Sequence, residues 1–409
     1  VDSGASMTFG NVVSGSGVLF KAGQGTLVLS ATNTNTGNTL VAGGTLRLDY
    51  GTTNTTKLAD AAQLQLGMQL SGGITALGSD ANVNGQTNIF GMQGGTVELA
   101  GGSHTEVVGS TLLNNGANRV IRSSGTSILQ MGSFTRSVAP GIAAGDGLLG
   151  YGTIDFGAAS IATTSTLNIG TGTNSILAGW ATVSLTDWAV NSTNAANGPI
   201  TALAAAGYNN NTGVTTFGAG FNTDVLVNTT LGGATTTQSV RFNQAGDITL
   251  NLGGNTLSLE SGGILLTPGS GNVLIENGTL NRSANTVGLD TIFHVNGSAS
   301  QVLQVNAVIA NNTNAQAITK TGEGTLTLGG ANTFTNRLNI QQGVLQVGDG
   351  TAATANARLG AGGSTNNQVT LAQGATLRFN VANPTAPAFN TQVVSGGGLI
   401  EFAADMFSS

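Results

Sequence analysis

Residues 23–48 read GQGTLVLSATNTNTGNTLVAGGTLRL, and residues 322–347 read GEGTLTLGGANTFTNRLNIQQGVLQV. The two stretches align without a gap, although most of the chain separates them. A pattern kept over such a distance indicates that the chain is built from one kind of supersecondary unit. The matched glycines and leucines are Gly23, Gly25, Leu27, Leu29 and Leu46 in the first copy and Gly322, Gly324, Leu326, Leu328 and Leu345 in the second.

The composition is typical of β structure with many turns. The 409 residues include 64 glycines, roughly twice the usual share. Only 7% of residues are charged, and the 39% that are apolar occur in short alternating runs. Disordered chains combine high charge with low hydrophobicity, and this chain has neither property.

The composition and charge also indicate whether a membrane span, a nucleic-acid partner or export is to be expected. No run approaches the ~18 consecutive apolar residues of a membrane helix, so no membrane span is predicted. The net charge is −6 and the twelve basic residues are scattered singly, which argues against a nucleic-acid partner. The absence of cysteine is compatible with export, because a large repeat core needs no disulfides.

One strand pattern recurs along the chain: glycine, usually immediately before a threonine, followed by alternating apolar and polar residues. Alternation with a period of two buries one face of a strand and exposes the other. We therefore expect Leu46 and Leu48 to point inward and Arg47 to point outward. The stretches with this pattern are Thr26–Leu29, Thr45–Leu48, Thr96–Leu99, Thr153–Phe156, Thr256–Leu259, Thr325–Leu328 and Thr376–Phe379.

The spacing of these strands predicts how they stack. Thr45 follows Thr26 by 19 residues, and Thr279 follows Thr256 by 23 residues. Such spacing is too long for simple hairpins and suits one coil of an elongated right-handed parallel β-helix, or β-solenoid, with Gly and Asn at its corners. At roughly 19 to 24 residues per coil the chain holds about 17 to 21 coils, with inward ladders of apolar side chains.

One stretch breaks the rhythm. Alternation fades after residue 186, and Ala202–Gly207 is the one helix-tolerant run. We predict a single structural domain in which a β-solenoid over residues 1–185 gives way to an excursion at 186–213. The solenoid then continues over 214–409.

The two repeat copies resemble the autotransporter-associated β-strand repeat. That family's core, K-x-G-x-G-T-L-x-L followed by N-T-(Y/F)-T, is matched by Lys320–Leu328 with Asn332–Thr335. The first copy departs from it, because Asn35 stands where an aromatic residue is usual. The resemblance implies an exported passenger-type β-helix on the surface of bacteria. It implies no activity, since such passengers include adhesins, toxins and proteases.

Some parallel β-helices are pectinolytic enzymes, which act through clustered carboxylates. The carboxylates of this chain are therefore candidates for the same chemistry. Asn222-Thr223-Asp224 resembles the N-T-D element of polygalacturonases, in which aspartates protonate a leaving oxygen and activate water. The chain has no Asp-Asp pair, and neither His104 nor His294 lies between glycines. We therefore interpret Asp224 as a strand-start residue at a coil corner and predict no catalytic residues.

Metal sites are weakly indicated. His104 and Glu106 could share a strand face, with Glu98 on a neighbouring coil, and three such side chains could hold zinc. A histidine on an exposed loop is the ordinary alternative. Gly145-Asp146-Gly147 and Gly348-Asp349-Gly350 are similar to calcium corners but lack the Gly/Asp nonapeptide repeat. We predict no metal and no cofactor.

Trp180 and Trp188 are the two tryptophans of the chain. If exposed, they could form a platform on which sugars stack. If buried, they plug the solenoid where the excursion begins, which is the favoured interpretation because large aromatic side chains usually fill cores.

These observations predict a non-enzymatic extracellular surface protein, a structural or adhesive rod or fibre segment whose partners are cell-surface glycans or further copies of itself. The alternatives are a polysaccharide lyase or hydrolase and a mechanical spacer that carries a distant functional tip. Val1–Gly4 begins the sequence without a polar cap. Leu399–Phe402, near its other end, is still strand-like. We expect further coils or a stacked subunit to cover such open coils.

Overall fold

A computed structural model describes residues 1–67, 94–136, 151–170, 174–211, 217–283, 290–361, 369–382 and 394–403. These residues form an all-β structure with two short 3-10 turns, η3 (Ala205–Gly207) and η4 (Ala352–Thr354), and no α-helix. None of the described helical turns is long and apolar enough to cross a membrane. The chain divides into two compact units: unit 1 comprises Val1–Asn168 and Trp180–Ala202, and unit 2 comprises Ile169–Gly179 and Leu203–Ser409.

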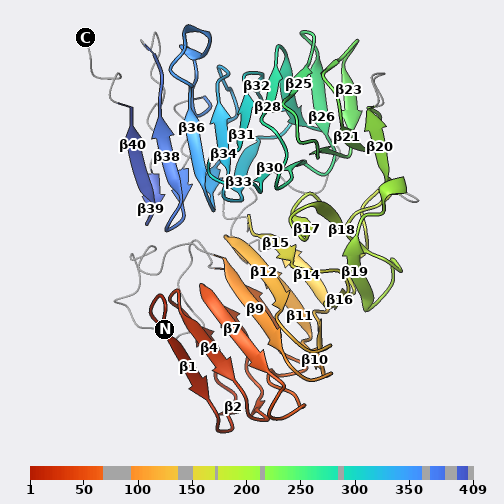
Figure 1. Cartoon of the computed structure of the whole chain (residues 1–409), viewed down its shortest axis with the longest axis vertical. Coiled ribbons are helices and arrows are strands. Elements are labelled where there is room, and N and C mark those ends of the chain that lie inside the picture. The colour runs from red at the N-terminus through yellow and green to blue at the C-terminus, as the bar shows by residue number, and fades with distance from the viewer. Residues whose placement is uncertain are drawn as a thin grey trace. The chain divides into compact units, whose positions relative to one another are not determined.

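Unit 1 is built mainly from parallel strands (Figure 1). Its largest sheet has the order β1 (Ser6–Phe9), β4 (Thr26–Leu29), β7 (Gly44–Asp49), β9 (Gly95–Ala100), β12 (Ala117–Arg122), β15 (Thr153–Phe156), β17 (Ala181–Val183), β18 (Asp187–Asn191), β19 (Gly198–Ala202), β16 (Ala162–Thr164), β13 (Ile128–Gln130) and β10 (Thr105–Val107). A second sheet has the order β14 (Ser133–Arg136), β11 (Ser110–Leu113), β8 (Gln63–Leu66), β6 (Thr39–Val41) and β3 (Leu19–Lys21), and β2 (Ser14–Gly15) pairs with β5 (Thr34–Asn35).

Unit 2 consists of three parallel sheets. The first has the order β20 (Tyr208–Asn211), β21 (Asn222–Val225), β24 (Ser239–Phe242), β27 (Gly263–Leu266), β30 (Asp290–Val295), β33 (Ala317–Thr321), β35 (Leu338–Ile340), β37 (Val369–Leu371) and β39 (Val394–Gly396). The second has the order β22 (Thr229–Thr230), β25 (Ile248–Asn251), β28 (Val273–Glu276), β31 (Val302–Val305), β34 (Thr325–Leu328), β36 (Val344–Val347), β38 (Thr376–Phe379) and β40 (Leu399–Phe402). The third has the order β23 (Thr235–Thr237), β26 (Thr256–Leu259), β29 (Thr279–Arg282) and β32 (Val308–Ile309).

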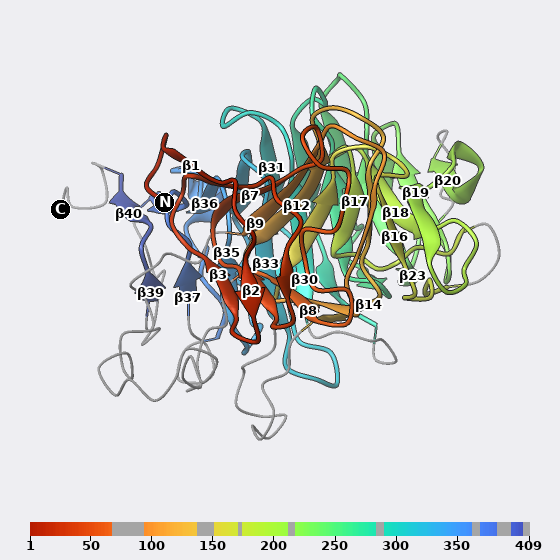
Figure 2. The same cartoon turned by 90° about the horizontal axis from the view of Figure 1, so that it is seen from below.

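The sheet orders show a β-solenoid, because most strands pair in parallel with a strand one coil further along the chain. In much of the chain, each strand pairs with the strand that comes three places later in the sequence. One coil therefore supplies one strand to each of three sheets. In Figure 2, β7, β9 and β12 of unit 1 lie on one side of the coils, and β8 and β14 lie on another. The predicted parallel solenoid is thus confirmed, and all seven stretches predicted as strands lie in strands.

The core is a set of in-register apolar ladders. Leu27 lies opposite Leu46 across β4 and β7, and Leu326 lies opposite Leu345 across β34 and β36. Leu46, Leu326 and Leu345 are fully buried, and Leu27 is 5% exposed. Arg47 is partly exposed, as the alternation predicts. Each coil therefore buries one stripe of every strand against the coils on both sides.

The corners of the repeat require glycine at the same place in both copies. Gly44 and Gly343 have φ values of 62° and 63°, in the left-handed region that side chains disfavour. A Cβ on Gly44 would lie 2.5 Å from the carbonyl oxygen of Gly23, and one on Gly343 would lie 2.6 Å from that of Gly322. At these corners the preceding coil approaches too closely for any side chain.

Antiparallel strands interrupt the solenoid at the end of unit 1. β17 pairs with β18, β18 with β19, and β19 with β16, all antiparallel. This set joins the sheet that holds β15 to the strands β16, β13 and β10, and it carries the fully buried Trp188. The described part of the predicted excursion thus contains antiparallel strands, followed by η3 and β20, and residues 212–213 lie outside the described residues.

A buried carboxylate holds the hairpin turn of this set. Ser184 and Leu185 have φ values of 55° and 63°, which side chains rarely adopt. Asp155 of β15 accepts hydrogen bonds at Oδ1 from the Leu185 N–H (2.8 Å) and from the hydroxyl of Thr182 (2.9 Å). These bonds offset the backbone strain of the turn.

Candidate functional site

The repeat lysines lie at corresponding buried positions in the two units. Lys21 ends β3 and is 1% exposed, and Lys320 lies in β33 and is fully buried. The Nζ of Lys21 donates to the carbonyl oxygens of Ala22 (3.0 Å), Gly23 (2.7 Å) and Gly43 (2.9 Å). Two acceptors belong to the turn that follows the lysine, and the third belongs to the next coil.

Lys320 makes the same three contacts. Its Nζ donates to the carbonyl oxygens of Thr321 (3.2 Å), Gly322 (2.5 Å) and Gln342 (2.9 Å), which align with the three acceptors of Lys21. Burial lowers the pKa of both lysines, and it lowers that of Lys320 to about 7. The three carbonyl oxygens favour the charged ammonium and oppose part of this effect.

The repeat asparagines join three successive coils. Asn33 accepts from the Val13 N–H (2.9 Å) and donates to the carbonyl of Lys57 (3.0 Å). Asn332 likewise accepts from the Ile309 N–H (2.8 Å) and donates to the carbonyl of Arg358 (2.9 Å). One amide thus satisfies a donor on the coil before and an acceptor on the coil after.

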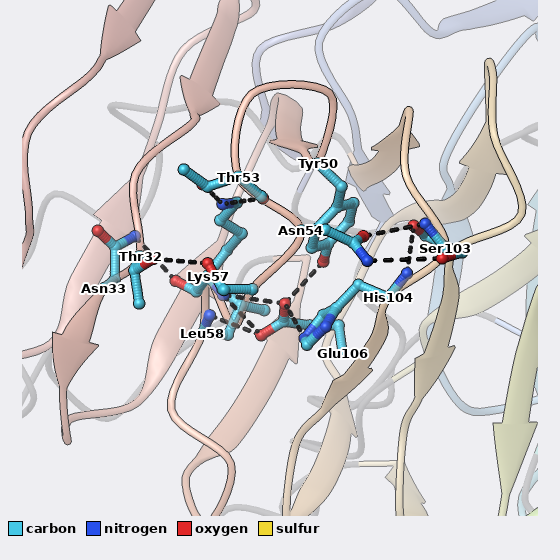
Figure 3. Close-up of polar contacts among 12 residues, drawn as sticks. Thr32, Asn33, Tyr50, Thr53, Asn54, Lys57, Leu58, Ser103, His104 and Glu106 are labelled. Carbon is cyan, nitrogen blue, oxygen red and sulfur yellow. Dashed lines mark hydrogen bonds and ion pairs between the residues drawn. The ribbon is translucent and has the colours of Figure 1, made fainter.

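Unit 1 also contains a buried carboxylate cluster around Glu106 of β10 (Figure 3). Its side chain is fully buried and accepts from the hydroxyl of Tyr50 (2.7 Å) and from two backbone N–H groups. These belong to Leu58 (2.7 Å) and to Lys57, which lies 2.9 Å from Oε2 and 3.1 Å from Oε1. Glu106 therefore fastens the 50–58 loop of the preceding coil to β10.

The same cluster gathers groups with shifted pKa values. Burial raises the pKa of Glu106, and burial, with a smaller effect of the Lys57 charge, lowers the pKa of His104. His104 Nε2 lies 3.8 Å from Glu106 Oε2 and is buried without a hydrogen-bond partner. Burial and the adjacent Glu106 charge raise the pKa of Tyr50 above its ordinary range. The cluster is closed on itself and serves to position the loop.

The structure does not bring the three candidate zinc ligands together. His104 is adjacent to Glu106 and is only partly exposed, whereas Glu98 pairs with Arg47 at 3.7 Å. The described residues contain no group of three or more His, Cys, Asp or Glu side chains that could hold a metal ion.

Of the two candidate calcium corners, that of Asp349 lies within the described residues. Asp146 lies outside the described residues. Asp349 Oδ1 accepts from the N–H and hydroxyl of Thr351 (2.9 and 2.6 Å) and the hydroxyl of Thr354 (2.7 Å), and Oδ2 accepts from Gln304 (2.8 Å). Both oxygens of Asp349 thus already have partners within the chain.

Asp224, the candidate catalytic aspartate, forms a buried ion pair. Its two oxygens accept from Nε (3.0 Å) and Nη2 (2.5 Å) of Arg241, whose guanidinium lies 3.6 Å from the ring centroid of Tyr208. Asp224 is the third residue of β21 and is 4% exposed, so the expected place at a coil corner was wrong. The amino-acid sequence does not show that Asp224 pairs with Arg241 on a parallel neighbouring strand, so it gave no reason to place Asp224 within a strand.

The remaining candidates lie in different surroundings. Trp188 is fully buried in β18. Trp180 is half-buried, with its ring 5.6 Å from that of Phe134 in an edge-to-face arrangement. His294 of β30 is 3% exposed, and its Nε2 lies 2.8 Å from the carbonyl oxygen of Gly179.

Sequence reasoning missed the lysine contacts and the Glu106 cluster. A signal for the first existed, because Lys21 and Lys320 occupy the same position of the repeat in a chain that is poor in charge. For the second, nothing in the order of residues joins Tyr50 and Lys57 to Glu106, which the next coil supplies.

The fold and these sites define a parallel β-solenoid whose repeated polar residues tie coil to coil. The passenger-associated-transport-repeat family matches residues 19–48 and 318–347, the two stretches that carry the lysine and asparagine contacts. The chain is also 30% identical over 379 residues to the adhesin BmaC autotransporter of Brucella suis biovar 1 (strain 1330). That alignment covers 88% of this chain and 10% of the relative. No solved structure matches the chain.

The chain is therefore an autotransporter passenger repeat protein, exported to the cell surface. It spans about a tenth of the length of the relative it matches.

Proposed function

We propose that this chain is a non-enzymatic segment of a surface protein and that its outward faces make weak, repeated contacts with cell-surface glycans. The observation that carries the proposal is a column of hydroxyl side chains on successive coils. Ser6, Thr26, Thr45 and Thr96 lie in register across β1, β4, β7 and β9, and none is fully buried. Repeated weak contacts of this kind gain strength by acting together.

Substitutions in this column of hydroxyls distinguish an adhesive role from that of a mechanical spacer. Replacing Thr26, Thr45 and Thr96 with Val removes three hydroxyls and keeps the β-branched shape that suits a strand. We expect binding on a glycan array and to host-cell surfaces to fall, while thermal unfolding stays unchanged. The same change at Thr256 and Thr279, an in-register pair of partly exposed hydroxyls in unit 2, should also lower binding. Equal binding of both variants and the parent chain supports a spacer.

The non-enzymatic part of the proposal is supported by the state of the candidate carboxylates. A glycosidase needs one carboxyl to donate a proton and a second to act as base or nucleophile. Asp224 is engaged at both oxygens by Arg241, and Glu106 is engaged by the 50–58 loop. Incubation with pectin, alginate and neutral glycans should release no reducing ends or unsaturated products. Turnover that Asp224→Asn abolishes would support a polygalacturonase-like enzyme instead.

We also propose Trp180 as a stacking position for a sugar, because it is half-buried beside Phe134. Trp180→Ala should then weaken glycan binding without changing the unfolding temperature by much. Trp188→Ala is the contrasting variant, since loss of a fully buried Trp side chain costs about 3–5 kcal/mol of stability. Unchanged glycan binding by Trp180→Ala would remove this residue from the proposal.

Self-association is a second candidate, favoured by exposed apolar side chains on two sheet edges. Met7 and Phe9 of β1 are 53% and 43% exposed, and Leu399 and Phe402 of β40 are 55% and 46% exposed. Exposed apolar edge strands favour pairing with another chain. Sedimentation of the purified chain should show concentration-dependent oligomers that the double substitution Met7→Lys and Phe9→Lys removes. A monomer at all concentrations would contradict this proposal.

A further inference from the structure

The sequence contains three lysines, Lys21, Lys57 and Lys320, and all three are buried. Each ammonium donates three hydrogen bonds. We propose that each lysine, in its protonated form, is a built-in monovalent cation, held in a cage of uncharged oxygens that ties one coil to the next, and that the empty cage would accept a small alkylammonium ion. This inference concerns the inside of the stack and does not depend on an adhesive surface.

The first support is that the same cage occurs in both copies of the repeat. The acceptors of Lys21 are the carbonyl oxygens of residues 22, 23 and 43, and those of Lys320 are the aligned carbonyl oxygens of residues 321, 322 and 342. The two units thus provide two independent examples. An ammonium has three N–H donors and no acceptor, which matches three converging oxygens.

The second support is a cage outside the repeat. Lys57 Nζ donates to the carbonyl of Ser30 (3.0 Å) and to the carbonyl (2.9 Å) and hydroxyl (2.6 Å) of Thr53. Its Nζ also lies 5.5 Å from the centroid of the Tyr50 ring. Figure 3 shows this ammonium between two segments of chain, with the Glu106 cluster beside it. The oxygen cage therefore does not depend on the repeat motif.

The third support is chemical. All nine acceptors are uncharged, so the cages bind the cation through oxygen dipoles rather than through a carboxylate. If the lysine is shortened, buried carbonyls lose their donors, and the cost of keeping them away from water is no longer offset. A planar guanidinium cannot point its donors at three converging oxygens as an ammonium does.

Chemical rescue tests the proposal on the full chain. Lys320→Ala should lower the unfolding temperature, and n-propylammonium chloride should restore part of the loss. Tetramethylammonium chloride and sodium chloride at equal concentration should not, because tetramethylammonium has no N–H donors and a bare sodium ion leaves the space of the lysine stem empty. Arg47→Ala, at a partly exposed cation, is the matched control and should respond equally to all three salts. Equal responses of Lys320→Ala to the three salts would overturn the proposal.

Amine labelling keeps the proposal testable if the variant does not fold. In the native chain, an acylating reagent should modify Lys21, Lys57 and Lys320 at least roughly tenfold more slowly than in the denatured chain, because labelling then requires local opening. Mass spectrometry of the peptides reads each lysine separately. Native labelling as fast as in the denatured chain would show that the ammonium groups are not caged. Lys57→Ala and Lys21→Ala provide the rescue test in unit 1.

Discussion

The two copies of the repeat show which of its residues are fixed by contacts and which are not. In unit 1 and in unit 2 the lysine, the asparagine and the corner glycine make the same contacts with the backbone of neighbouring coils. One buried side chain near them differs, since Asn35 of the first copy aligns with Phe334 of the second. We call this the filler position. The backbone partners allow little choice of side chain, whereas the space beside them can be filled in different ways.

The filler position also shows a cost. Phe334 is fully buried, and Asn35 is 6% exposed with neither amide atom in a hydrogen bond. Burying an amide without partners costs free energy, whereas a buried ring contributes by leaving water. We infer that the first copy is held by its backbone contacts more than by its core.

The largest expected effect comes from a charge placed in the ladder of either copy. Leu326→Asp should unfold unit 2, because it buries an unpaired carboxylate between two coils. Leu27→Asp should have a smaller effect in unit 1, where the leucine is 5% exposed. Amide hydrogen exchange reads the two units separately. A neutral result for Leu326→Asp would mean that the side chain faces outward, one residue out of register.

A second comparison targets the filler. Phe334→Ala should lower the free energy of unfolding by about 3–5 kcal/mol, as for other buried aromatic side chains. Asn35→Ala should be neutral or stabilising, because it removes two polar atoms without partners. Urea unfolding followed by hydrogen exchange gives both values. A large loss for Asn35→Ala would show that its amide has partners in solution.

The asparagine contacts should be equally important in both copies. Asn33→Ala and Asn332→Ala each leave a buried N–H and a buried carbonyl without partners, so each should cost about 1–3 kcal/mol. Asn→Asp at either position keeps the acceptor but turns a buried carboxylate oxygen toward the carbonyl that the amide had bonded, so it should cost at least as much as the alanine variant. Exchange at the Val13 and Ile309 amides should accelerate most. Costs that differ widely between the units would contradict the equivalence.

The most gradual effect is a dependence on pH carried by Lys320. Its pKa is about 7 in the folded chain and 10.5 as the ordinary value. Between these values the unfolded chain binds a proton that the folded chain does not, so stability should rise with pH from about 7 to about 10. The slope is at most about 1.4 kcal/mol per pH unit.

Lys320→Met provides the control for this prediction, since it has no group that titrates at this position. Its unfolding should show a shallower slope between pH 7 and 10 than the parent chain, whereas Arg47→Met should keep the full slope. Parallel pH profiles for Lys320→Met and the parent chain would show that Lys320 titrates at its ordinary value in the folded chain.

Much of this protein follows from local sequence. Glycine followed by Thr-Leu-x-Leu and the return after 19 to 23 residues predict parallel coils, because alternation selects the buried face and glycine permits the corner. The ladders Leu27–Leu46 and Leu326–Leu345 followed from these rules and lie in register. The family was visible in the same residues.

The tertiary structure alone decided where the polar residues go. Asp224 meets Arg241 and Glu106 holds the 50–58 loop because of partners that lie one coil away. The antiparallel β17–β19 set is local in sequence, but its pairing with β16 joins it to the earlier coils. A hydrogen bond depends on the distance and direction between two groups, and the order of residues fixes neither across a coil boundary. Apolar alternation needs only one face and one interior, so the sequence determined the ladders, whereas the lysine cages required the stacked coils to be seen.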